Sequence, residues 1–217
     1  MFVRPLLVLI LVAILQIGLL RSVKAEMKFD FAITDDGSRI LFVIGRFDYD
    51  DNLVAFTNAV TSNRPDVVTF DSGGGNPSAA MRYGRRIRAL GLDTVQVRQF
   101  DCMSACALAF MGGVNRTAEP GSIGVHQTYF ETQNELNGAN AVAAIQSHTA
   151  EVIAFMTEMG VSPVILQLSL SVGSDDIRFL TGREMERYGV IGSAEIDLSS
   201  SVTRYAGIPA REPGLRP

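Results

Sequence analysis

The sequence has few of the side chains that usually serve as catalytic bases. Its 217 residues include only two histidines, His126 and His148. Tryptophan is absent altogether. Lysine occurs at Lys24 and Lys28 alone, both near the amino end. A serine–lysine dyad deep in a folded domain is therefore not expected. Any nucleophile that needs an imidazole as its base must use one of the two histidines.

Charge is also sparse, and acidic residues predominate. The formal net charge is −4, and residues 1–25 hold three basic residues and no acidic one, so the rest of the chain carries −7. Arg82, Arg85, Arg86 and Arg88 have helical spacing. On an acidic chain, a solvated helix face explains them better than a nucleic-acid-binding patch does. We expect no nucleic-acid partner.

The first residues resemble an export signal. Arg4 supplies a positive start, residues 5–20 form an apolar run, and Val23 and Ala25 fit the small residues before a cleavage site. The alternative is an uncleaved anchor, but about sixteen residues is short of the roughly 20 that cross a bilayer. We expect a signal peptide over 1–25, an exported (periplasmic or secreted) domain over 26–207, and a loose tail over 208–217. In the alternative, residues 5–20 anchor the domain to a membrane.

Apolar patterning and turn residues predict short strands that alternate with helices in one domain. The expected strands are residues 27–33, 39–45, 66–71, 94–97 and 122–126, and the expected helices are residues 50–62, 77–90, 138–159, 163–171 and 181–188. Right-handed crossovers between such strands give a largely parallel sheet. The fold class is therefore α/β, with binding sites expected at the carboxyl ends of the strands.

Three segments near predicted strand ends carry groups suited to acyl chemistry. Ser104 stands among small residues, where its hydroxyl can face a cleft beside the first amides of a helix. The Ser72–Gly75 turn offers more amides, because glycines let backbone approach a ligand closely. His126 ends a strand, whereas His148 lies within a polar-faced helix and is expected to be solvated or capping. Taken singly, the turn and His126 are better explained as structural. Together they predict a nucleophile, a base and an oxyanion site.

The order of these segments resembles the proteolytic subunit of Clp protease. The matching segments are Val43-Ile44-Gly45-Arg46-Phe47, Asp71-Ser72-Gly73-Gly74-Gly75, Cys102-Met103-Ser104-Ala105-Cys106, Gly124-Val125-His126-Gln127, Phe179-Leu180-Thr181-Gly182-Arg183-Glu184 and Tyr188-Gly189-Val190-Ile191. The resemblance covers residues 40–191. It implies a Clp-protease/crotonase-like fold of repeated β-β-α units, with a largely parallel sheet flanked by helices.

The resemblance also implies roles for particular residues. Ser104 would attack an acyl carbon, His126 would take its proton, and the amides of Gly74 and Ala105 would form the oxyanion hole. The substrate would be a peptide or a small acyl compound, with no cofactor and no metal. The helix over residues 138–159 would match the family's segment for ring-to-ring contact, which makes a homo-oligomer an expectation.

Two departures from the family pattern affect these expectations. The family's triad aspartate falls where this chain has Ile177, and Asp176 and Asp175 lie one and two residues earlier. A shift in the loop would let Asp176 orient His126, and a dyad with a backbone or water partner is equally open. Gly73 replaces the proline of the family's turn. An export signal is foreign to the cytosolic protease, so no ATP-driven unfoldase is expected as a partner.

Cys102 and Cys106 flank the predicted nucleophile. An exported protein meets conditions that permit disulfides, although regular helix geometry puts such a pair near the limit of Cα separation. A disulfide, two buried free thiols and a catalytic Cys106 paired with His126 all remain open. Structural zinc sites have four ligands, and the two cysteines with at most one nearby histidine supply fewer, so a zinc site is not expected.

Two other functions are compatible with the same residues. A crotonase-type acyl-CoA enzyme would use the same oxyanion hole, but export away from coenzyme A argues against it. A catalytically inactive binding or scaffold protein would keep the fold and use the cleft or the long helix for a partner. The missing aspartate at the family position is the main support for that second alternative.

Overall fold

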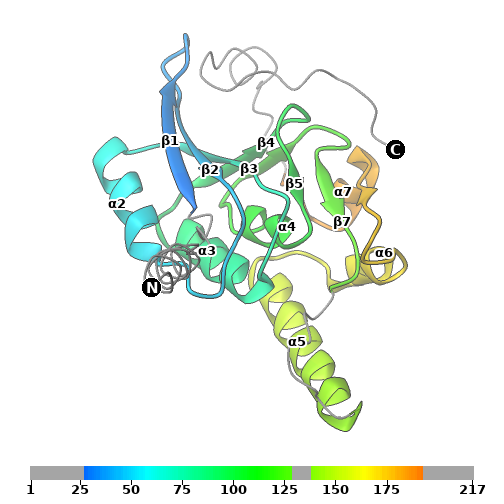
Figure 1. The fold of residues 1–217 in the computed structure, drawn as a ribbon. Coiled ribbons are helices and arrows are strands. Elements are labelled where there is room, and N and C mark those ends of the chain that lie inside the picture. The colour runs from blue at the N-terminus through cyan, green and yellow to red at the C-terminus, as the bar shows by residue number, and fades with distance from the viewer. Residues whose placement is uncertain (1–26, 129–137, 193–217) are drawn as a thin grey trace, which may run out of the picture.

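A computed structural model of the chain describes residues 27–128 and 138–192 (Figure 1). The expected signal peptide and the expected loose tail lie outside the described residues. The described part is mixed α/β, with a mostly parallel sheet flanked by helices, which confirms the predicted class.

The main sheet has five strands in the order β1-β2-β3-β4-β6. Their bounds are Lys28–Ile33 for β1, Arg39–Ile44 for β2, Val67–Asp71 for β3, Asp93–Gln96 for β4 and Arg116–Ala118 for β6. β1 pairs antiparallel with β2, and every other neighbouring pair in this sheet is parallel. Helix α2 (Leu53–Asn63) connects β2 to β3, and helix α3 (Pro77–Ala89) connects β3 to β4.

Strand β2 is apolar from Ile40 to its end because both of its faces are covered. Leu41 and Val43 join the main hydrophobic core, which includes side chains from α2, α3 and helix α4 (Ala105–Phe110). Ile40 and Phe42 belong to a smaller cluster, where the rings of Phe42 and Phe100 meet edge to face with centroids 5.6 Å apart. The alternation of a strand thus supplies both clusters from neighbouring residues.

Helix α3 is fixed at its start by local chemistry and along its length by a close contact. The Asn76 side chain accepts a hydrogen bond from the Ala79 amide, and Pro77 occupies the first turn. Further along, a Cβ placed on Gly112 would lie 2.2 Å from the carbonyl oxygen of Gly84. The segment after α4 therefore packs backbone to backbone against α3, which only glycine permits there.

A second, three-stranded sheet lies beside the first. It contains β5 (Cys102–Met103), β7 (Ile123–Val125) and β8 (Arg178–Phe179), with β5 and β7 parallel and β8 antiparallel to β7. Ser72, just after β3, forms a bridge with Cys102, and the Met103 amide donates to the Ser72 carbonyl at 3.1 Å. This bridge brings the glycine turn after β3 next to β5.

The carboxyl-terminal part differs from expectation in one element and agrees in another. The single helix expected over residues 163–171 is a short 3-10 turn, η1 (Pro163–Ile165), followed by the five-residue helix α6 (Leu166–Leu170). Helix α7 (Gly182–Arg187) begins with the predicted capping box, in which the Thr181 hydroxyl and the Glu184 carboxylate each accept from the other's amide.

Helix α5 (Gly138–Glu158) extends away from the body of the molecule (Figure 1). Its buried side chains, Val152, Phe155 and Met156, lie in its carboxyl-terminal half. Towards the other end, Val142 and Ile145 are 54% and 49% exposed. Within the two described ranges, no helix combines the length and the apolar character needed to cross a membrane.

A buried arginine joins the ends of three helices. The guanidinium of Arg116 donates to backbone carbonyls that follow α4, α5 and α7, namely those of Met111, Gly113, Met159, Gly189 and Val190. Burial, with the neighbouring charge of Arg88, lowers the pKa of Arg116 to about 10. Carbonyls at helix carboxyl ends favour a cation, so this contact fastens the C-terminal segment to the core.

Candidate active site

Ser104 lies at a sharp turn between strand β5 and helix α4. Its φ of 57° and ψ of −124° lie in a region that residues with a Cβ rarely adopt. Such a conformation costs of order 1–3 kcal/mol. Arg64 also has a positive φ, but its φ of 49° and ψ of 55° form an ordinary left-handed helix end. A strained strand-to-helix turn that presents a serine hydroxyl is the geometry of a nucleophile elbow.

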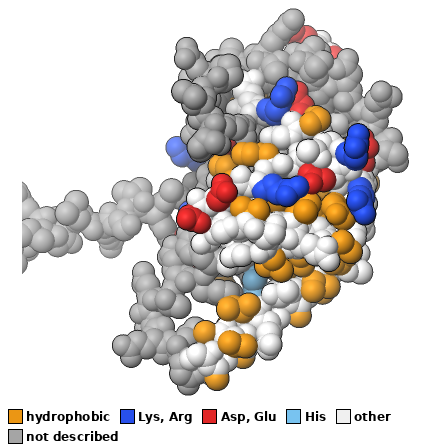
Figure 2. All heavy atoms as spheres, turned by 90° about the vertical axis from the view of Figure 1, so that its right-hand side faces the viewer, with side chains coloured by type: hydrophobic (Ala, Val, Ile, Leu, Met, Phe, Trp, Pro, Cys, Tyr) orange, Lys and Arg blue, Asp and Glu red, His pale blue; other side chains and the backbone are white. Residues whose placement is uncertain are grey.

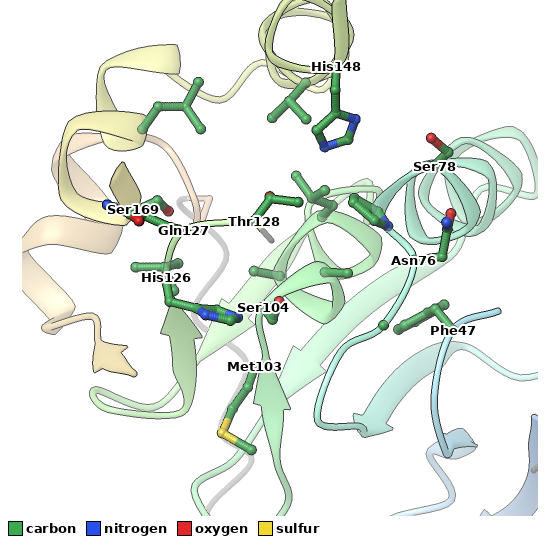
Figure 3. A pocket seen from close by; sticks show the side chains of 18 of the residues that line it. Phe47, Asn76, Ser78, Met103, Ser104, His126, Gln127, Thr128, His148 and Ser169 are labelled. Atoms are coloured by element: carbon green, nitrogen blue, oxygen red, sulfur yellow. The ribbon is translucent and has the colours of Figure 1, made fainter. Parts of the chain in front are cut away.

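Backbone hydrogen bonds hold the elbow on both sides. The Ser104 amide donates to the Gly124 carbonyl at 2.8 Å, and the Ser104 carbonyl accepts from the Ala107 amide at 3.1 Å. The Ser104 hydroxyl makes no capping hydrogen bond to helix α4. It lies at the wall of a cavity instead (Figure 3).

His126 follows strand β7 by one residue, as Ser104 follows β5. The two strands run parallel with Met103 opposite Gly124, so their carboxyl ends bring both side chains to one edge of the sheet. Figure 3 shows the imidazole directed towards Ser104 in the same cavity. The structure therefore brings together the two residues that the sequence predicted as nucleophile and base.

Asp176 is not brought to His126. Its carboxylate is exposed and accepts a hydrogen bond from the amide of Ile177 at 2.7 Å. The Nδ1 atom of His126 is buried and has no hydrogen-bond partner among the described residues. β7 and β8 pair Val125 with Arg178, so continuing the register sets Ile177, rather than Asp176, opposite His126. The expected third member is thus displaced by one residue, which turns its side chain away.

The two predicted oxyanion donors have different surroundings. A Cβ placed on Gly74, whose φ is +102°, would lie 2.7 Å from Ser104 Cβ and 3.1 Å from the Ala105 nitrogen, so the turn touches the elbow. Ala105 is the first residue of α4, where amides lack intrahelical acceptors. The Gly74 amide, however, donates to the Ser72 hydroxyl at 3.1 Å. The structure thus leaves the Ala105 donor available and engages the Gly74 donor within its own turn.

A disulfide joins Cys102 and Cys106, whose Cα atoms are 5.2 Å apart. Cys102 belongs to β5 and Cys106 to the first turn of α4, so the bridge crosses the elbow. The spacing is reached because the pair does not lie in one regular helix. A free thiol at Cys106 paired with His126 is thereby excluded in this structure.

The cavity beside Ser104 and His126 has a volume of about 850 Å³. Its apolar wall comes from α4, α5 and η1, with the side chains of Ala107, Leu108, Met111, Val152, Met156 and Ile165. Polar lining groups come from the glycine turn, the start of α3 and the segment after β7, including Asn76, Ser78, Gln127 and Thr128. Figure 2 shows hydrophobic side chains gathered around a hollow in which a histidine is visible. A substrate with an apolar part would find complementary contacts here.

His148 departs from its expectation as a solvated or capping residue. It lines the same cavity from helix α5, across from Ser104 (Figure 3). Burial lowers its pKa, and the Glu151 carboxylate partly opposes that shift. The signal that sequence reasoning missed is the helical spacing of His148, Val152 and Met156, which places them on one face.

No group of three or more histidine, cysteine, aspartate or glutamate side chains in the described parts of the chain could hold a metal ion. The chain matches no protein-family model and no curated protein sequence. The chemistry of the site must therefore be inferred from its own geometry.

Proposed function

We propose that the chain is an exported serine hydrolase with a Clp-protease/crotonase-like fold, a peptidase in the first instance, that acts through an acyl-enzyme on a peptide or small acyl substrate. The observation that carries the proposal is the strained elbow at Ser104, with the imidazole of His126 directed at it in one cavity. Backbone strain of this kind concentrates at functional sites, since folding alone gains nothing from it.

In the proposed reaction, Ser104 Oγ attacks the acyl carbon while His126 accepts the hydroxyl proton. The bond to the leaving group then breaks, and His126 returns the proton to that group. Water next attacks the ester with His126 again acting as base, which releases the acid and restores the serine. These steps use the two side chains and water.

The negative charge that develops on the acyl oxygen is stabilised by hydrogen-bond donors that are positioned before the reaction begins. The Ala105 amide is one, and Gly74 becomes the second when the oxyanion replaces the Ser72 hydroxyl as its acceptor. Each such donor is worth about 2.7–4 kcal/mol of barrier in other hydrolases. His126 works as a dyad with Ser104, without a carboxylate from Asp176.

One observation favours a second candidate, a non-catalytic binding protein on the same fold. His126 Nδ1 has no hydrogen-bond partner among the described residues, and Asp176 is turned to solvent. A protein that had lost catalysis would have no need to orient that ring. In this reading the cavity binds a partner segment and Ser104 is unreactive.

We also propose a second copy of this chain as a partner. Helix α5 extends from the body with apolar residues such as Val142 and Ile145 exposed, and it has no basic residue. The acidic residues of α5, Glu151 and Glu158, lie in its carboxyl-terminal half, so its protruding half is free of Lys, Arg, Asp and Glu. A protruding half that is partly apolar and lacks these charges can pack against its counterpart in a second copy. The expected export signal, which would place the assembly outside the cytosol, belongs to the same proposal.

A fluorophosphonate probe tests the hydrolase. Its phosphorus is attacked by an activated serine and fluoride leaves, so labelling reports nucleophilicity without knowledge of the substrate. We expect labelling of the wild type, none of Ser104→Ala, and at least about hundredfold slower labelling of His126→Ala. Ser169→Ala is the matched control, because it removes another hydroxyl from the cavity wall. A folded wild type that does not react would establish the binding protein instead.

A further inference from the structure

We propose that the disulfide between Cys102 and Cys106 is a positioning device for the nucleophile, which holds the Ser104 turn and the Ala105 amide in their reactive arrangement. This inference rests on the proposed hydrolase function. The side chains of Ser104 and His126 do not by themselves explain how the serine is held in a reactive geometry, and the disulfide would provide that restraint.

The bridge encloses just three residues, and the middle one is strained. Met103, Ser104 and Ala105 lie between the two cysteines, and Ser104 carries the φ of 57°. A loop this short restricts the unfolded chain far less than a long one does. Its effect is therefore concentrated on the geometry of the elbow, where the main-chain torsions of Ser104 cannot relax without moving both cysteines.

The elements on either side of the elbow are too small to impose that geometry alone. Strand β5 has two residues and helix α4 has six. A helix of that length has little stability of its own. The strand side is tied by hydrogen bonds to Ser72 and Gly124. The disulfide supplies a covalent tie on the helix side, in the turn that contains the Ala105 amide.

Both cysteines are fully buried, with exposed fractions of 0%. The bridge therefore contacts the core rather than solvent. Reduction adds only two hydrogens and lets the two sulfur atoms move apart to van der Waals contact, whereas replacement of either cysteine also removes a sulfur atom from the core. Reduction is therefore the smaller perturbation.

The test compares oxidised and reduced full-length protein in the rate of fluorophosphonate labelling. The protein is reduced in urea with dithiothreitol and refolded in the same reductant. The reductant's two thiols become a cyclic disulfide, while the protein gains two hydrogens as two thiols. Intact mass verifies each state, and circular dichroism verifies the fold. We expect reduced, folded protein to label at least about tenfold more slowly, a loss that corresponds to relaxation of the strained turn.

Val60→Ala is the control for a general loss of stability. Val60 is buried in α2 and does not line the cavity. Oxidised Val60→Ala, compared at a matched distance from its urea midpoint, is expected to label at the wild-type rate. If Val60→Ala and reduced wild type label equally slowly, the labelling rate depends on overall stability. That result would refute a positioning role for the disulfide.

Each remaining outcome also decides the matter. Reduced, folded protein that labels as fast as oxidised protein overturns the inference and leaves the hydrolase intact. Absence of labelling in oxidised wild type overturns both. If reduced protein does not refold, the Cys102→Ala/Cys106→Ala variant replaces it, and slow labelling of that folded variant supports the inference. If neither folds, the bridge stabilises the whole fold, and a specific positioning role is excluded.

Discussion

Replacement of Gly74 by alanine tests whether the glycine turn touches the nucleophile elbow. The added methyl would lie 2.7 Å from Ser104 Cβ, 2.8 Å from the Met103 carbonyl oxygen and 3.1 Å from the Ala105 nitrogen. None of these neighbours is the free end of a flexible side chain, so relief of the clash requires movement of the elbow. Gly37→Ala is the matched control, because its φ of +85° is also positive and nothing lies within 4 Å of its added methyl.

The magnitudes follow from those two environments. A side chain at a left-handed backbone position costs about 1–2 kcal/mol, which both variants share. Overpacking against rigid neighbours adds about 1–3 kcal/mol at Gly74 alone. With an m-value of about 2 kcal/mol/M in urea, the extra cost lowers the urea midpoint of Gly74→Ala by about 0.5–1.5 M relative to Gly37→Ala.

Two measurements on the same samples separate the effects. Urea unfolding followed by circular dichroism gives the stability difference, and fluorophosphonate labelling gives the reactivity of Ser104. Gly74→Ala is expected to be the less stable variant and to label more slowly, because Ser104 and the Ala105 amide are displaced. Gly37→Ala is expected to label at the wild-type rate. Equal midpoints and equal labelling rates would refute the contact between turn and elbow.

Four further substitutions have expected outcomes. Arg116→Met removes a buried cation and leaves the carbonyls of Gly189 and Val190 without a side-chain donor, whereas Arg88 still donates to the other three carbonyls. We therefore expect a loss of about 2 kcal/mol or more by urea unfolding. Arg39→Ala, in an exposed ion pair, is expected to keep a urea midpoint close to that of the wild type. His148 has its pKa lowered from 6.5 by burial against the opposing effect of Glu151. The folded state thus resists its protonation, and stability should fall as pH drops through 6.5 towards the lowered pKa; in His148→Gln, urea midpoints should show a smaller fall. Ile177→Asp is expected to speed fluorophosphonate labelling.

The sequence predicts elements well where their signals are local. Residues 40–44 form a continuous apolar run, and residues 67–70 are apolar except for Thr69, as expected for strands buried on both faces. The capping box of Thr181 and Glu184 marked the start of α7 because it satisfies amides within four residues. β5 and β8 have two residues each. Strands this short are defined by their pairing with distant segments, so no local sequence pattern predicts them.

The candidate site also has parts that the sequence predicts and parts that depend on the tertiary structure. Ser104 could be predicted from its small neighbours, and His126 because it ends a predicted strand, where sites of parallel sheets form. The engagement of the Gly74 amide by Ser72 depends on backbone torsions that the letters Ser-Gly-Gly-Gly do not determine. The place of His148 depends on which face of α5 packs against the body, which is a tertiary property.

Ile177 is the position where one substitution would complete a triad. Val125 pairs with Arg178, so a continuation of that register would set Ile177 opposite His126, and Ile177 lines the cavity. An aspartate there would come from the residue just before β8, whereas the Asp176 carboxylate accepts from the neighbouring amide and is exposed.

A carboxylate beside a buried imidazole nitrogen favours the tautomer that leaves the other nitrogen free to accept a proton, and it stabilises the imidazolium that follows. In serine proteases this orientation is worth up to about 10⁴-fold. A new side chain not shaped for the site should recover a small part of it, about tenfold in labelling rate. Ile177→Asn offers equal size without charge, and Asp176→Asn tests the displaced carboxylate, which we expect to have no effect. If folded Ile177→Asp reacts no faster than Ile177→Asn, orientation of His126 does not limit the chemistry, and the dyad already works at the rate that the elbow permits.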